Sequence, residues 1–414
     1  MSSKAPLLTA RLPLGSRLLL ALKNPDFRPL WGSALMNYLG STMSALVLGW
    51  YVLETTGSPW NLAQFVFYQG VAQLFLSPFA GALSDRFPRK SLLVVGGTIK
   101  FLPLLFLTSL MYSGQIQLWH IYVASGIASL GRMVDLTTYR VATHDIVGDE
   151  GIINAMSLDS FGRHASRGLG PLMGGVLYDV AGPHIAVTAV TAAQLGSLLL
   201  LIPVRLQRRT SGPQKATSIF GDTLRGLAYV SRNKMILGIV MGAMVTNFFL
   251  LPMLSMMPTF ARDVLHISAT KLGVMTAVGT LGSVSGALFM VSRGTISRPA
   301  LFWLGFAYSL AVATILFSLS RWFTLSTFIL VVHGFIFAPM GVIQPSLVAS
   351  GAMSFSMSLG PMGALVMGSL ITSLGPSAGL AVSAGIAILL LTLVASLSPG
   401  FLRGSFKPTS VATT

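Results

Sequence analysis

The sequence has no cysteine and few charged residues. Without cysteine, a disulfide framework, thiol chemistry and thiolate metal sites are excluded. Charged residues make up 9% of the 414 positions, whereas soluble proteins carry about 25%. So few charges cannot cover a water-exposed surface, and 53% of the residues are hydrophobic, with a mean hydropathy of +0.75. The composition therefore predicts a polytopic membrane protein.

Acidic residues are scarcer than basic ones. The chain has 11 Asp and Glu against 27 Lys and Arg, which gives a formal net charge of +16. The bases stand in short segments between apolar runs, where they orient membrane helices and contact anionic lipid headgroups. They form no patch interleaved with aromatic residues, so we expect a lipid bilayer as partner and no nucleic acid. No acidic residue follows Asp263, so no carboxylate beyond that position can carry a site.

Signatures of enzymes and of directly ATP-driven proteins are also missing. The sequence has no Gly-x-x-x-x-Gly-Lys-Ser/Thr loop to cradle phosphates, so we expect no direct use of ATP. Its six histidines are scattered and include no His-x-x-x-His pair, so we expect no metal site and no cofactor. No Ser-His-Asp set can be assembled from sequence neighbours. We expect a protein that is not an enzyme.

Apolar runs of about 20 residues, the length that crosses a bilayer, recur along the whole chain and predict about twelve spans. Basic residues concentrate in alternate loops, which predicts that both termini are cytoplasmic. The expected spans are 28–53, 61–83, 91–112, 117–141, 152–178, 184–203, 235–258, 271–292, 299–319, 322–343, 352–373 and 377–398.

The spans divide into two groups of six. Residues 1–27 form a basic cytoplasmic segment that lacks a signal-peptide cleavage site. We predict a six-helix bundle over 28–203, a cytoplasmic linker over 204–234, a second six-helix bundle over 235–398 and a cytoplasmic tail over 399–414. Short motifs recur at matching places in the two halves: Ala155-Met156-Ser157 as Ala352-Met353-Ser354, and Leu169-Gly170-Pro171 as Leu359-Gly360-Pro361. This indicates a parallel repeat and an all-α membrane fold.

A short, doubly basic turn joins the second and third spans. It reads Gly81-Ala-Leu-Ser-Asp85-Arg86-Phe-Pro-Arg89-Lys90. An ordinary stop-transfer charge cluster would also be basic, but the stretch resembles the G-x-L-x-D-R-x-G-R-K loop of the major facilitator superfamily, with Pro88 in place of a glycine. The resemblance implies two six-helix bundles that work by alternating access.

The fifth span carries a second motif, Gly170-Pro171-Leu172-Met173-Gly174-Gly175. Glycine-rich membrane helices are common, but this one resembles the G-P-x-x-G-G core of drug and proton antiporters, with Ser166 replacing an upstream glycine. Residues 27–32, 54–58 and 258–265 look like the bacterial branch that contains enterobactin and macrolide exporters. These resemblances imply export of a small drug-like or siderophore-like molecule across a bacterial inner membrane by proton antiport. One chain suffices for this architecture, so we expect a monomer.

Charged residues inside membrane spans are costly and are functional candidates by default. Arg132 and Asp135 share one face of the fourth span, and Asp159, Arg163 and Arg167 share one face of the fifth. We predict that a salt-bridge network closes the cytoplasmic gate, and the alternative is a proton-coupling role for a carboxylate. The predicted gating residues are Asp85, Arg86, Arg89, Lys90, Asp135, Arg163 and Arg167. The proton-coupling candidates are Asp135, Asp159 and His333, the last a histidine that packing alone also explains.

Polar residues within the spans are candidates for lining a substrate cavity. Lys100 is ten residues in from Lys90 and is expected to face an aqueous cavity because it cannot reach a membrane surface. Each of these residues is also compatible with a place in the packed core or against lipid. The predicted set is Asn37, Tyr38, Gln64, Tyr68, Lys100 and Asn247.

Two other functions remain open from the sequence. One is uptake or uniport of a nutrient or lipid-like solute. The other is a transport-dead membrane sensor or assembly partner, which the segment Ser350-Gly351-Ala352 favours because the family usually places a basic Arg-Gly-Arg there.

Overall fold

A computed structural model describes residues 21–76, 87–206, 234–293, 298–347 and 356–397, and these contain no β-strand. The first half comprises η2 (Ala21–Lys23), α2 (Phe27–Thr56), α3 (Pro59–Leu76), α5 (Arg89–Tyr112) and α6 (Leu118–Leu201). The second half comprises α8 (Lys234–Val245), η3 (Thr246–Leu250), α9 (Pro252–Ser255), α10 (Met257–Asp263), α11 (Ala269–Arg293), α12 (Pro299–Leu319), α13 (Phe323–Leu347), α15 (Gly360–Leu374) and α16 (Pro376–Leu397).

Two glycines divide the 84 residues of α6 into three membrane-length legs. Gly148 has φ 68° and Gly182 has φ 85°, a backbone region that glycine adopts without steric cost. The chain reverses at each, which leaves legs over 118–147, 149–181 and 183–201. Eight described helices are long and apolar enough to span a membrane, and α6 counts among them once. With its three legs counted separately, and with α2 and α3, the described residues supply the twelve predicted spans.

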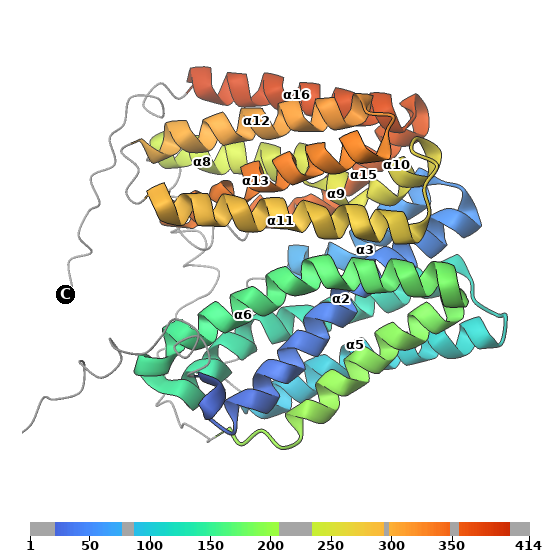
Figure 1. The fold of residues 1–414 in the computed structure, drawn as a ribbon, viewed down its shortest axis with the longest axis vertical. Helices are drawn as coiled ribbons and strands as arrows, with labels where there is room; N and C mark the ends of the chain where they lie inside the picture. The colour runs from blue at the N-terminus through green and yellow to red at the C-terminus, as the bar shows by residue number, and fades with distance from the viewer. Residues whose placement is uncertain (1–20, 77–86, 207–233, 294–297, 348–355, 398–414) are drawn as a thin grey trace, which may run out of the picture.

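The helices pack as two bundles (Figure 1). One contains α2, α3, α5 and α6, and the other contains the helices from α8 to α16. The seventh span is interrupted, because η3 is a π-helical turn and Pro252 and Pro258 lie in the first turns of the short helices that follow it. The all-α fold of two bundles is confirmed. The residue boundaries proposed for the linker and the tails stay predictions, since 1–20, 207–233 and 398–414 lie outside the described residues.

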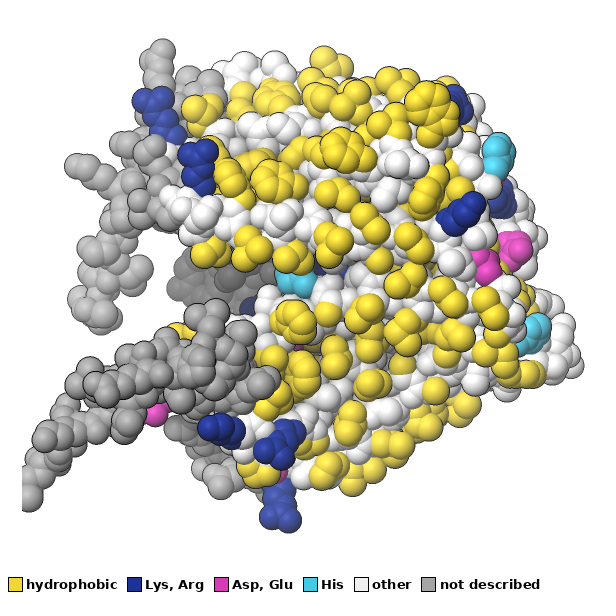
Figure 2. Space-filling model, in the orientation of Figure 1, with side chains coloured by type: hydrophobic (Ala, Val, Ile, Leu, Met, Phe, Trp, Pro, Cys, Tyr) yellow, Lys and Arg dark blue, Asp and Glu magenta, His cyan; other side chains and the backbone are white. Residues whose placement is uncertain are grey.

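Charged side chains gather at the two ends of the bundles, and apolar side chains cover the surface between them (Figure 2). We call the end where α5 begins at Arg89 and α11 ends at Arg293 the basic end. The opposite end is where α2 finishes at Thr56 and α11 starts at Ala269. An apolar belt between two charged rims is the surface that a bilayer requires.

The two bundles contact each other backbone to backbone toward the opposite end. The second leg of α6 lies against α11, and these helices approach so closely that a Cβ on Gly175 would lie 2.3 Å from the Ala269 carbonyl oxygen. One turn further in, a Cβ on Gly273 would lie 2.5 Å from the Pro171 oxygen. Gly168 then faces Ala277 with a wider gap of 3.5 Å. The opposite end is therefore closed in this conformation.

Candidate functional site

Glycines allow α5 and the first leg of α6 to approach at one level of the first bundle. A Cβ on Gly131 would lie 2.4 Å from the Gly96 carbonyl oxygen and 2.8 Å from Cγ of Lys100. A Cβ on Gly96 would lie 2.7 Å from Oδ1 of Asp135. Small residues at such crossings let membrane helices pack backbone to backbone. This contact places the side chains of Lys100 and Asp135 within reach of each other.

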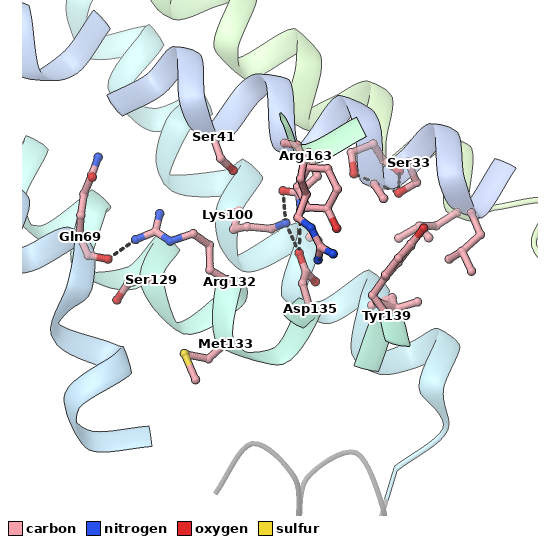
Figure 3. Close-up of a pocket in the computed structure, with 18 residues that line it drawn as sticks. Ser33, Ser41, Gln69, Lys100, Ser129, Arg132, Met133, Asp135, Tyr139 and Arg163 are labelled. Atoms are coloured by element: carbon pink, nitrogen blue, oxygen red, sulfur yellow. Dashed lines mark hydrogen bonds and ion pairs between the residues drawn. The ribbon is translucent and has the colours of Figure 1, made fainter. Parts of the chain in front are cut away.

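A buried ion pair joins these two helices. The Lys100 ammonium, 2% exposed as a residue, forms a salt bridge with Oδ2 of Asp135 (Figure 3). The same ammonium donates to Oδ1 of Asn37 on α2 at 2.6 Å. Nδ2 of Asn37 in turn donates to Oδ2 of Asp135 at 3.3 Å. Lys100, Asp135 and Asn37, which we call the triad, therefore link three helices through one amide, one cation and one carboxylate.

Arg132 points away from the triad toward α3. Its guanidinium donates to the backbone carbonyl of Gln69, as Figure 3 shows. Arg132 and Asp135 are three residues apart, as the expected shared helix face requires, but their hydrogen-bond and ion-pair partners lie on different helices. Arg132 thereby connects α6 with α3, whereas Asp135 connects α6 with α5 and α2.

A second carboxylate is paired deeper in the bundle. Asp159 is 0% exposed, and its Oδ2 lies 2.7 Å from Nη2 of Arg163, one turn along the same leg of α6. The Tyr38 hydroxyl on α2 donates to Oδ1 of Asp159 at 2.8 Å. The Arg163 guanidinium also lies over the Tyr38 ring, 5.8 Å from its centroid. Asp159 is thus a fixed partner that holds Arg163 and Tyr38 in place.

The triad lines a cavity of about 290 Å³. This volume is at the lower limit of small-molecule sites, which run from about 300 to 1,000 Å³. Three predicted cavity residues line it, Asn37, Tyr38 and Lys100, and so do the predicted gating residues Asp135 and Arg163. Further polar residues line it as well: Ser33, Ser41, Gln69, Ser129, Arg132, Tyr139 and Ser197.

Of the remaining predicted gating residues, Arg89 and Lys90 lie at the basic end, and each has its own partner. Arg89 forms a salt bridge with Asp145, and Nζ of Lys90 donates to the Ile202 carbonyl at 2.7 Å. Arg167 is exposed. Asp85 and Arg86 lie outside the described residues, as does the whole stretch 77–86. The single gate network therefore stays a prediction.

The glycines of the fifth-span motif contact both bundles. Gly170 and Gly174 pack against α2, where added Cβ atoms would meet Thr42 and Met43. Gly175 and Pro171 face α11 of the other bundle, as described above. The motif thus lies at the junction between the bundles.

The other predicted residues lie away from the triad. Gln64 accepts a hydrogen bond from the Tyr122 hydroxyl at 3.2 Å, and Tyr68 stacks on the same ring at 5.2 Å. Asn247 is buried in the π-helical turn and donates to the Ala243 carbonyl at 2.8 Å. His333 is 2% exposed in α13, and among the described residues no hydrogen-bond partner reaches its Nε2.

The pairing of Lys100 with Asp135 was not predicted. Hydropathy locates a span but does not fix its rotation about its axis, so it cannot say which charges meet. A signal was nonetheless present, because Gly96 and Gly131 each stand four residues from one of the paired charges, Lys100 and Asp135 respectively. Glycines at that spacing mark close helix crossings.

Comparison with known proteins gives relatives that are transporters. The chain is 24% identical to the enterobactin exporter EntS of Salmonella choleraesuis (strain SC-B67) over 330 residues, covering 78% of this chain and 77% of the relative. It is 20% identical to macrolide efflux protein A of Streptococcus pyogenes over 284 residues, covering 66% and 68%.

Solved structures with the same fold are transporters as well. The nucleoside transporter NupG superposes with a TM-score of 0.73 at 14% identity, covering 90% of this chain and 99% of that structure. An inward-facing bacterial homologue of the human lysosomal transporter Spinster gives 0.69 at 14% identity, covering 96% and 99%. At these identities the superpositions show the fold alone.

The family described as transmembrane secretion effector matches residues 18–399, nearly the whole chain. This match agrees with the two-bundle helical fold and with the exporters found among the relatives. The protein is a multi-pass membrane transporter for small molecules and not an enzyme, and it belongs to the transmembrane secretion effector family of the major facilitator superfamily.

Proposed function

We propose that the protein exports a small amphipathic compound, drug-like or siderophore-like, in exchange for protons, by alternating access of the two bundles. The observation that carries this proposal is the triad, a membrane-buried carboxylate paired with a lysine on the wall of a cavity. Buried ionisable residues of this kind mark ion and substrate pathways in transporters.

Asp135 is the better candidate of the two carboxylates for carrying the proton. Its partners come from two other helices, so a movement between helices changes its surroundings. Asp159 instead pairs with Arg163 one turn away on its own leg, and that spacing is fixed by the helix. A carboxylate that takes up a proton must lose its cation partner, which the arrangement around Asp135 allows.

The triad also gives Lys100 an alternative partner. When a proton from one side of the membrane joins the Asp135 carboxylate, the ammonium keeps its hydrogen bond to Oδ1 of Asn37. When the proton leaves to the other side, the ion pair forms again. A substrate that donates a hydrogen bond to the Asp135 carboxylate stabilises its charged form and therefore competes with the proton. Because of this competition, substrate and proton cross the membrane in opposite directions.

The exporter relatives and the distribution of basic residues support an outward direction of transport. Lys and Arg at the basic end indicate that this end is cytoplasmic, with both termini on the same side. The closed opposite end then faces outward, so the cavity is accessible to a substrate from the cytoplasm. We propose the bacterial inner membrane as the location and the monomer as the working unit.

Transport into and out of proteoliposomes tests the proposal. Purified protein is reconstituted alone, and flux of an amphipathic panel (cationic, neutral and anionic dyes) is followed with and without an imposed pH gradient. We expect gradient-driven flux of at least one compound, which falls to the level of protein-free liposomes in Asp135→Asn. The matched control is Asp149→Asn, because the Asp149 side chain is 94% exposed at the basic end and pairs with His144.

Each outcome decides between the candidate functions. Flux that ignores the pH gradient contradicts antiport and supports uniport. Flux that runs with the protons supports uptake. No flux of any compound, in protein that is folded and inserted, supports the transport-dead sensor or assembly partner.

A further inference from the structure

Two segments far apart in the sequence meet at the opposite end of the molecule. Residues 54–58 include the end of α2 in the first bundle, and residues 258–265 include most of α10 in the second. Arg262 of the second segment donates from Nη1 to the Leu53 carbonyl oxygen and from Nη2 to the Gly57 carbonyl oxygen at 3.3 Å. One guanidinium therefore crosses between the bundles to the end of α2.

The acceptors are the last carbonyls of a helix, which is where a cation is most stabilising. Gly57 closes α2 in the left-handed conformation, with φ 64°, and its N–H donates to the Leu53 carbonyl. Terminal carbonyls carry the negative end of the helix dipole and lack partners within the helix. Nε of Arg262 lies 2.6 Å from Oδ1 of Asp263, which orients the guanidinium.

The reverse arrangement is found at the start of α11. The Asp179 carboxylate of the first bundle accepts a hydrogen bond from the backbone N–H of Thr270 at 2.8 Å. This N–H lies in the first turn of α11, where the dipole is positive and a carboxylate is favoured. The Thr270 hydroxyl donates to the Gly175 carbonyl at 3.1 Å, next to the closest backbone contact of the two bundles.

We propose that Arg262 and Asp179 form the latch that holds the opposite end closed, and that both contacts must break once in every transport cycle. Each bundle supplies one charge and one helix end, so the two contacts run in opposite directions across the junction. This assignment rests on the alternating access of the proposed function and adds gating residues at the opposite end, where the sequence had indicated none.

The chemistry suits a contact that opens and closes repeatedly. A helix end that loses its cap is satisfied by water, so opening exposes no orphaned backbone group to lipid. The second leg of α6 and α11 meet backbone against backbone, from Gly175 to Ala269 and from Pro171 to Gly273. Apolar side chains of α3 and α15 also pack across the junction, with Ala63 against Gly368. The charged hydrogen bonds add to this apolar contact.

Distances between spin labels in the purified full-length protein test this latch without any substrate. The chain has no cysteine, so labels are placed only where cysteines are introduced. One pair, Gln115→Cys with Trp322→Cys, reports the separation of the bundles at the opposite end, where both residues are exposed. A second pair, Ile153→Cys with Val291→Cys, reports the basic end from residues 79% and 81% exposed.

We expect Arg262→Gln and Asp179→Asn each to raise the ratio of open to closed opposite ends about tenfold, the effect of one lost hydrogen bond to a charged group. The distance at the basic end should shorten in the same molecules. Arg262→Lys should restore part of the closed population, because an ammonium still reaches a helix-end carbonyl. Lys271→Gln removes an exposed base at the same end and should change neither distance.

Unchanged distances in both latch variants would overturn the proposal. A purely structural role would lower the melting temperature without shifting the two distances in opposite directions, and this result also contradicts the latch. Because the distances need no substrate, a failure of the transport proposal in the liposome assay leaves this test intact. Conversely, a latch variant that still transports but shows the same two spin-label distances as the unmodified protein would exclude the latch. That result would not contradict the proposed export.

Discussion

The first bundle buries charges within its spans, whereas the second has almost none there. Lys100, Arg132, Asp135, Asp159 and Arg163 all lie inside the first bundle. In the second half the sequence has no Lys, Arg, Asp or Glu between Arg321 and Arg403. The two bundles share a fold but differ in their buried charges. This difference supports the assignment of proton coupling to the first bundle.

The second bundle contributes backbone surface to the junction, and its contacting charge lies outside the apolar spans. Its α11 presents Gly273 and Ala269 to the fifth-span motif, and α10 presents Arg262 to the end of α2. An apolar bundle can move against its partner without carrying charges through the membrane, which would be costly. The comparison therefore predicts that substitutions in the two bundles fail in different ways.

The largest effect is expected for Lys100→Met. This variant leaves the Asp135 carboxylate without its cation, and removing one partner of a buried ion pair costs about 3–5 kcal/mol. Asp135 then stays protonated, so proton-driven flux is lost, while the melting temperature falls if the carboxylate is forced to ionise. The double variant Lys100→Met/Asp135→Asn should recover the melting temperature but not the flux. Proton-driven flux in Lys100→Met would contradict the role of the pair.

Gly131→Val should break the helix crossing that creates the pair. Its side chain collides with the Gly96 carbonyl and with Lys100, and overpacking of this kind costs roughly 1–3 kcal/mol. We expect a lower melting temperature and reduced transport. Gly126→Val lies on the same leg with no heavy atom within 4 Å of its Cβ position, so it is the matched control. Equal behaviour of the two variants would show that the crossing does not matter.

Gly175→Val should separate the bundles rather than disrupt either one. The new side chain meets the backbone of Ala269 and Thr270 across the junction. We expect an opened opposite end in the spin-label distances, with transport lowered several-fold and each bundle still folded. Gly305→Val, in α12 with open space around it, controls for the added volume. If Gly175→Val instead destabilised the protein without changing the spin-label distance at the opposite end, the contact would contribute only to packing.

The smallest effect is expected for His333→Gln. His333 is the one titratable side chain between Arg321 and Arg403 with a pKa near neutrality in its free state, yet no described partner reaches its Nε2. If coupling belongs to the first bundle, proton-driven flux should stay within about twofold of the unmodified protein, since a neutral amide preserves size and polarity. If the flux of His333→Gln no longer responded to the pH gradient, the assignment of proton coupling to the first bundle would be contradicted.

Hydropathy predicted the spans, and the repeated motifs together with the resemblance to the major facilitator superfamily predicted their division into two bundles. Twelve apolar runs and short turns leave few ways to pack, and the chain reversals near 142–151 and 179–183 coincide with Gly148 and Gly182. The motif at 170–175 was singled out by its resemblance to antiporters, and the structure shows its partners on α2 and α11.

Pairing across helices was beyond the reach of the sequence. Asp135 was singled out because a carboxylate in a span is rare, but its partner depends on how α5 is rotated, which Gly96 and Gly131 determine together. Arg262 gave no warning of its role, because a base outside the apolar run appears as an ordinary loop charge. Its role depends on its hydrogen bond to the end of α2, about two hundred residues earlier in the chain.

Proton release on substrate binding tests the central claim most directly. A compound identified in the liposome panel is added to detergent-purified protein in weak buffer with a pH indicator. At a pH low enough to protonate the Asp135 carboxylate and break its ion pair with Lys100, we predict release of up to about one proton per chain, in the unmodified protein and in His333→Gln alike, and none in Asp135→Asn. Undiminished release in Asp135→Asn, or release lost in His333→Gln, would contradict the assignment of coupling to the first bundle.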